Sequence, residues 1–304
     1  MTLEPTKAGV MKLDTAHYHG WDGRLRSPWR SSLAIVKVAL LQVFRRKSYW
    51  VVIGLGLLQF IVFFAIIYAV TQLGAFKNRV LEQLNFVADP SGDSDRNGYL
   101  MFMERQSLVV MMLLAFAGSL LVGSDFRLKS LPFYLSRRID RRHYIVGKLL
   151  AIGAIVGLLT VVPALLLYLE YGAFTSSFEY WLDNWKLVLS ILGYGLVLCT
   201  VLSIMLVTLS AYLQRTAPIA ITWSSLFFML VVIARQMRDV TGNRNWLLLD
   251  PWRDMRYVGR YCFGYFPGAE DRELGMRAFA ILSGVCVVCL VALAYRVRAV
   301  DVVE

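Results

Sequence analysis

The stretch YWVVIGLGLLQFIVFFAIIYAVTQLG, residues 49–74, contains no Asp, Glu, Lys, Arg or His. Five further runs share this property, and they cover residues 107–124, 149–169, 187–213, 217–234 and 278–295. At about 1.5 Å per helical residue, each run can cross roughly 30 Å of hydrocarbon. Backbone amides in lipid must be satisfied internally, and these runs do not alternate as barrel strands do. We therefore expect six transmembrane helices.

The composition agrees with this expectation. Hydrophobic residues make up 58% of the 304 residues and charged residues only 17%, which is too apolar for one water-soluble domain. The first run is longer than the apolar core of a cleavable signal peptide, and about fifty residues that include Asp14 and Arg24 precede it. We expect an all-α integral membrane protein, with an N-terminal segment over residues 1–48 and a membrane domain over residues 49–304.

Charge is distributed unevenly between the two sides of the six runs. The side with residues 1–48, 125–148, 214–216 and 296–304 holds 19 Lys and Arg against 7 Asp and Glu, a net charge of +12. The other side holds 13 against 14, a net charge of −1, and together the two sides give the chain's +11. Because basic loops stay in the cytoplasm, we expect a multi-pass protein of the cytoplasmic membrane with both termini inside.

An apolar stripe precedes the first run. In the stretch LAIVKVALLQVFRRKSYW, residues 33–50, the stripe is formed at helical spacing by Leu33, Val36, Leu40, Val43 and Phe44. Three basic residues follow it directly. An apolar stripe with a cationic end is typical of a helix that lies in the membrane interface. The same pattern would also suit a simple anchor for the first span, and the sequence leaves both interpretations open.

Aromatic residues are dense between the fifth and sixth runs, among many arginines. The candidates that we select there are Trp246, Trp252, Tyr257 and Tyr261. Such residues favour the membrane interface. The local stretch NWLLLDPW contains too few apolar residues to cross the membrane. This segment therefore either dips into the membrane and returns, or rests on its surface as a cap.

The loop between the second and third runs carries a distinctive pattern. Its candidate residues are Asp125, Ser136, Arg137, Arg138, Ile139, Arg141, Tyr144, Gly147 and Lys148. A basic loop beside a span can simply stay in the cytoplasm and contact anionic lipid. The spacing, however, resembles the first cytoplasmic loop of type-2 ATP-binding-cassette permeases. In that family an acid ends the second span, and a Ser-Arg-Pro-Ile-x-Arg stretch precedes an aromatic residue and a Gly-Lys pair.

The sequence departs from the family pattern at two places. Arg138 stands where the family usually has proline, and residues 128–131 stand where it often has Gly-Thr-Leu. The match of individual residues is dense only around residues 125–150. Elsewhere the likeness lies in the order of the segments along the chain. That order includes an N-terminal elbow helix, six spans and a segment before the last span, which in the family forms short re-entrant helices at an outer gate.

The resemblance implies a permease subunit of an exporter. It implies a homodimer of this chain with two copies of a cytoplasmic ATPase, which docks on the loop pattern. The chain has no phosphate loop of its own, because Gly147-Lys148 is followed by Leu149 and Arg142 stands where glycine would be needed. ATP would therefore be bound and hydrolysed by the partner. The lipid membrane is the other expected partner, and no nucleic acid is expected.

Other functional classes have less support in the sequence. The six runs contain no ionisable side chain for an ion-coupled transporter or channel, and nothing indicates catalysis, a metal or a cofactor. A membrane scaffold or assembly factor without transport remains an alternative, as does a secondary transporter. Cys286 and Cys289 are read as small apolar residues rather than a metal pair. Gly153 and Gly157 form a GxxxG motif, which predicts a close helix crossing rather than a specific dimer contact.

Overall fold

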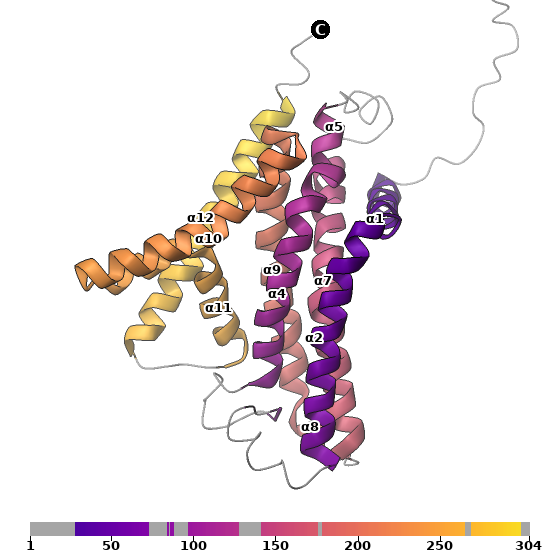
Figure 1. Ribbon diagram of the computed structural model, residues 1–304, viewed down its shortest axis with the longest axis vertical. Helices are drawn as coiled ribbons and strands as arrows, with labels where there is room; N and C mark the ends of the chain where they lie inside the picture. Colours follow the sequence, from indigo (N-terminus) through magenta and orange to yellow (C-terminus); the bar gives the residue numbers. More distant parts are fainter. Residues whose placement is uncertain are drawn as a thin grey trace, which may run out of the picture.

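The computed structural model describes residues 28–72, 84, 86–87, 97–127, 141–175, 178–264 and 269–298. Six of its helices are long and apolar enough to cross a membrane (Figure 1). They are α2 (Lys47–Gln72), α4 (Gly98–Gly118) with its continuation η3 (Ser119–Gly123), α7 (Arg141–Thr175), α9 (Trp185–Leu213), α10 (Thr216–Thr241) and α12 (Ala269–Arg298). The prediction of an all-α protein with six candidate transmembrane helices is confirmed.

The second spanning helix begins earlier than its uncharged run. α4 contains Glu104, which lies outside that run. Asn97 starts the helix, because its side-chain oxygen accepts hydrogen bonds from the backbone N–H groups of Tyr99 and Leu100, each at 3.1 Å. A capping residue sets where a helix begins, whereas a charged side chain changes only its composition. Uncharged runs therefore locate spans well and underestimate helix length.

α4 is the most deeply buried spanning helix, and α2 and α12 are the least buried. Side chains from several neighbours pack on α4. The ring of Phe63 on α2 meets that of Phe102 edge-on at 5.3 Å between centroids. On the α10 side, the indole of Trp223 donates a hydrogen bond of 3.2 Å to the carbonyl of Met111. The core thus surrounds α4, while the outer helices expose apolar faces to the surroundings, as helices in lipid do.

The predicted close crossing lies between α7 and α9. The thiol of Cys199 donates to the carbonyl of Gly153 at 3.3 Å, and a Cβ added at Gly157 would lie 3.6 Å from the same sulfur. Small residues let the two backbones approach closely. The GxxxG motif therefore serves a contact inside one chain, which confirms the interpretation as a helix crossing.

Helix α1 (Pro28–Phe44) precedes α2 and lies at the upper right of the bundle in Figure 1. Ser32, Ala39 and Val43 are buried, whereas Leu33 is 62% exposed. Of the predicted stripe, Val43 therefore packs inside the protein and Leu33 faces outward, and the interfacial position of this helix stays a prediction. The packing face lies over α7, and small residues at Ser32 and Ala39 allow this contact although neither contributes much to an apolar stripe.

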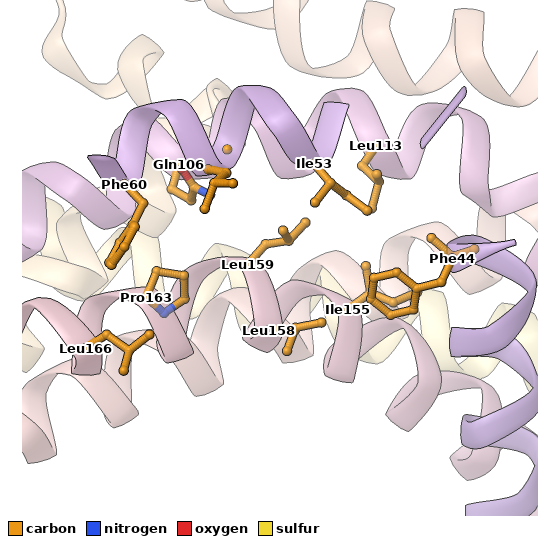
Figure 2. Close-up of a pocket in the computed structure, with 13 residues that line it drawn as sticks. Phe44, Ile53, Phe60, Gln106, Leu113, Ile155, Leu158, Leu159, Pro163 and Leu166 are labelled. Atoms are coloured by element: carbon orange, nitrogen blue, oxygen red, sulfur yellow. The ribbon is translucent and has the colours of Figure 1, made fainter. Parts of the chain in front are cut away.

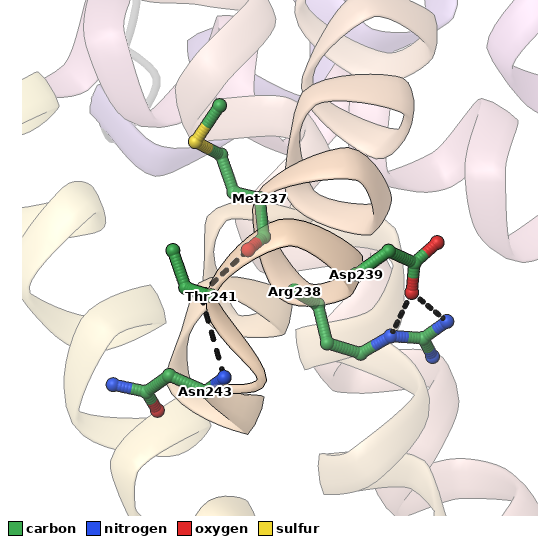
Figure 3. A network of polar contacts seen from close by, with 5 residues as sticks. All are labelled: Met237, Arg238, Asp239, Thr241 and Asn243. Atoms are coloured by element: carbon green, nitrogen blue, oxygen red, sulfur yellow. Dashed lines mark hydrogen bonds and ion pairs between the residues drawn. The ribbon is translucent and has the colours of Figure 1, made fainter.

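The α10 helix ends at an exposed turn that sends the chain back toward the bundle. Figure 3 shows Thr241, whose hydroxyl donates to the carbonyl of Met237 at 2.6 Å and accepts from the backbone N–H of Asn243 at 3.4 Å. Gly242 closes the helix with φ +67°, a conformation that favours glycine. Two short helices follow, η4 (Arg244–Leu249) and α11 (Pro251–Cys262), before the chain enters α12.

Candidate functional site

The structure describes the two ends of the loop that carries the sequence pattern, and it brings residues from these two ends together. Asp125 lies in the short helix α5 (Ser124–Arg127), which continues α4 through the π-helical turn η3. Tyr144, Gly147 and Lys148 lie in the first turns of α7. Four other predicted residues lie outside the described part of the chain, namely Ser136, Arg137, Arg138 and Ile139. Arg141 is the first residue of α7, and its side chain is not described.

Asp125, Tyr144 and Lys148 form one compact group, the Asp125 cluster. The Lys148 Nζ lies 2.7 Å from Asp125 Oδ2, and the Tyr144 hydroxyl donates to the same oxygen at 2.9 Å. The Lys148 ammonium also donates to the carbonyl of Leu121 in η3. It lies 5.7 Å from the centre of the Tyr144 ring. The carboxylate thus has both a charged and a neutral donor.

The cluster is largely withdrawn from solvent. The side chain of Lys148 is 8% exposed and that of Asp125 is 13% exposed. A buried ion pair offsets its loss of hydration only when further hydrogen bonds satisfy both partners. Tyr144 and the Leu121 carbonyl supply these bonds. Residues four apart on a helix face the same side, so Tyr144 and Lys148 can both reach one carboxylate on the neighbouring helix.

Helix α1 rests on the same turn of α7. The Ser32 hydroxyl donates to the carbonyl of His143 at 3.1 Å, and a Cβ added at Gly147 would lie only 3.0 Å from the Ile35 side chain. Glycine therefore lets α1 approach α7 closely at this level. No sequence pattern indicated the contribution of Ser32, because this residue precedes the apolar stripe.

The four predicted outer residues have different surroundings. Trp246 on η4 is 40% exposed, whereas Trp252 on α11 is half-buried with its ring 6.4 Å from that of Phe227 on α10. Tyr257 lies 5.7 Å from the guanidinium of Arg260. The Tyr261 hydroxyl donates to a carbonyl of α12 at 2.5 Å. Of the two tryptophans, Trp246 is the more exposed.

A buried acid in α11 was missed by the sequence reasoning. Asp254 is 1% exposed, and its Oδ1 has no hydrogen-bond partner in the described structure. Burial raises the pKa of this carboxyl to about 8, with a further contribution from the negative charge of Asp250 and a smaller opposing one from Arg253. Two residues further on, Arg256 forms an ion pair of 3.2 Å with Glu104 and so ties α11 to α4.

The stability of the chain should fall as the pH rises from about 4 to about 8, and Asp254→Asn should remove the part of this fall that the Asp254 carboxyl causes. Folded Asp254 keeps its proton up to about pH 8, whereas the unfolded carboxyl ionises near its ordinary pKa of 3.8. Between these values the folded state binds the extra proton, so the free energy of unfolding drops by up to about 1.4 kcal/mol per pH unit. Thermal unfolding in detergent at acidic and alkaline pH measures this slope.

The matched control for this prediction is Asp239→Asn, because the Asp239 side chain is 62% exposed. The control should keep the pH slope of the unmodified chain. An unchanged slope in Asp254→Asn would show that this carboxyl ionises in the folded protein as it does in the unfolded chain.

Comparisons with known proteins give no further assignment. No protein-family model matches the chain, and no curated protein matches it. Function must therefore be argued from the geometry of the Asp125 cluster and from the residues around it.

Proposed function

We propose that the chain is the permease subunit of an ATP-binding-cassette exporter, dimeric, and driven by two copies of a separate cytoplasmic ATPase. The ATPase docks on residues 128–140, between α5 and α7. The observation that carries this proposal is the Asp125 cluster, which joins the two helices on either side of that loop. Together with the contact of α1 at Gly147, it makes the base of the loop one packed unit.

Such a unit suits a coupling element. A force applied to the loop would reach α4, α7 and α1 together, because the buried ion pair and the close helix contact oppose separate movement. Coupling between distant sites needs contiguous packed elements of this kind. A loop held only by its two covalent connections would absorb the force instead. The decisive experiment is ATP hydrolysis by the reconstituted pair, with variants in the loop.

Two other functions are distinguished by specific measurements. A scaffold would use the Asp125 cluster only for stability and would have no ATPase partner. A secondary transporter is favoured by Glu170, which is 9% exposed within α7 and has no hydrogen-bond partner for either carboxylate oxygen in the described structure. Acids inside membrane spans often bind a coupling ion. Gradient-driven flux in liposomes that contain this chain alone would establish the secondary transporter.

We propose that both termini and the 128–140 loop face the cytoplasm. The net charges of +12 and −1 on the two sides support this orientation. Cysteines introduced at Ser94 and Ser177 should react with a membrane-impermeant maleimide on intact cells, and a cysteine at Ser136 should not. The unmodified chain is the control, since its four native cysteines are only partly exposed. Labelling at residue 136 from outside would reverse the orientation.

We propose that η4 and α11 shape the outer end of the pathway. Trp246→Asp should reduce export strongly, because a carboxylate is less favourable than an indole at the membrane interface. ATPase binding should stay intact, because the ATPase docks on the opposite side of the membrane. Export from intact cells and copurification of the ATPase are measured together. The control is Trp185→Asp, because Trp185 is a similarly exposed tryptophan, 54%, at the start of α9. Normal export in Trp246→Asp would indicate a surface cap.

A further inference from the structure

An apolar groove of about 220 Å³ lies between α2, α4 and α7 (Figure 2). Leucine, isoleucine, valine and phenylalanine side chains form most of its wall. Among the described residues that line it, Gln106 alone has a polar side chain. In Figure 2, Gln106, Phe60 and Pro163 lie toward one end of the groove and Phe44 toward the other. The groove therefore has an apolar length and one polar end.

The polar end has an unused hydrogen-bond acceptor. Gln106 is 1% exposed, and its Oε1 has no hydrogen-bond partner in the described structure. Pro163, on the opposite wall, has no N–H to donate to the carbonyl of Leu159, another lining residue. An unsatisfied amide oxygen in an apolar environment is costly. This end of the groove is thus suited to a ligand that donates a hydrogen bond.

The surroundings of the groove define where a ligand would come from. Leu57, Leu158 and Leu166 line it and are 57%, 43% and 47% exposed. These residues belong to helices that can span a membrane, so the groove opens sideways toward the hydrocarbon. None of the described residues that line it is charged. A charged group at this depth would have no partner, and the ligand must be neutral.

We propose that the groove binds a neutral single-chain amphiphile from the membrane, whose hydroxyl or amide N–H donates to Gln106 Oε1. The apolar chain extends from Gln106 past Ile155 toward Phe44. From Pro163, at the Gln106 end, to Ile155 the lining of α7 covers about 12 Å along the helix axis, a length suited to an extended chain rather than a compact ring. Binding of this amphiphile does not depend on the ATPase, because residues of this chain alone form the groove.

The test uses the full chain in lipid nanodiscs and a long-chain alcohol with a photoactivatable diazirine in its chain. Crosslinks are located by mass spectrometry, with unlabelled dodecanol and dodecane as competitors. Dodecanol should reduce labelling of α2 and α7 about fivefold more than dodecane does, because one additional hydrogen bond of about 1 kcal/mol raises the affinity about fivefold. In Gln106→Leu, which keeps a similar volume without the acceptor, the two competitors should be equivalent.

Two glycines of α2 provide a matched pair of blocking variants. A Cβ at Gly56 would lie 2.7 Å from the Gln106 amide nitrogen, whereas a Cβ at Gly54 would have nothing within 4 Å. Gly56→Leu should abolish the labelling, and Gly54→Leu should keep it. The proposal is overturned if dodecane competes as well as dodecanol in the unmodified chain, or if Gln106→Leu retains the preference for the alcohol. Labelling that dodecanol does not reduce would mean that only water or bulk lipid occupies the groove.

Discussion

Replacing Lys148 with methionine should lower the free energy of unfolding by about 3 kcal/mol or more, because it removes the ammonium group that pairs with the largely buried carboxylate of Asp125. The two side chains are 8% and 13% exposed, and their charged atoms lie 2.7 Å apart. Methionine nearly preserves the volume of lysine, so lost packing contributes little to the effect. Chemical unfolding in detergent micelles, followed by tryptophan fluorescence, measures the difference.

A double-mutant cycle separates the ion pair from the other roles of the two residues. Asp125→Leu should also be strongly destabilising, since it removes the carboxylate that pairs with the buried ammonium of Lys148. The double variant should be more stable than the sum of the single effects predicts, because no buried charge remains. Tyr144→Phe should cost less, about 1.5 kcal/mol, as one hydrogen bond to a charged group is lost.

Lys186→Met is the control for this cycle, because Lys186 is an exposed lysine on α9. It should change stability by less than about 0.5 kcal/mol. Strictly additive effects of the Asp125 and Lys148 variants would mean that the pair does not interact in the folded chain. In that case the base of the loop would not be one packed unit, and the structural support for a coupling role would be lost.

The sequence predicted the spans because hydrocarbon imposes a simple rule on composition. Every uncharged run of sufficient length became a long helix, and the first span begins within two residues of its run. The ends of α4 and α7 could not be predicted in this way, since capping by Asn97 and packing at Tyr144 extend helices through charged residues. Glu170 likewise follows the uncharged run 149–169 by one residue, yet it lies buried within α7.

The candidate site was predictable only in part. The resemblance to a family loop pattern selected Asp125, Tyr144 and Lys148, but it did not predict that they contact one another. The structure shows that contact, because two residues four apart on a helix can both meet one acid at the end of the preceding helix. The contribution of Ser32 depends on how α1 crosses α7, which no local pattern encodes. Asp254 could not be recognised either, since a buried acid and an exposed one look alike in a sequence of many arginines and acids.

Arg141→Glu, and separately Ile139→Asp, should abolish copurification of the ATPase or reduce its stimulated ATP hydrolysis to the basal rate, while the chain still inserts and folds. A docking segment needs particular arginines to meet acids or carbonyls of the partner, and particular apolar side chains to fill gaps. Loss of such a central contact costs about 2 kcal/mol or more in binding. Substrate-stimulated ATP hydrolysis by the reconstituted pair is the measurement.

If the loop served only as a topological anchor, its charges would be interchangeable, and the position of each would matter little. Arg215→Glu is therefore the matched control, because Arg215 is an exposed arginine on the proposed cytoplasmic side, at the turn between α9 and α10. It makes the same change of charge outside the docking loop and should leave hydrolysis intact. Arg137→Lys and Arg138→Lys give a graded comparison, since lysine keeps the charge but loses the paired donors of arginine. Wild-type stimulation in both Arg141→Glu and Ile139→Asp would mean that the basic residues serve the membrane rather than an ATPase.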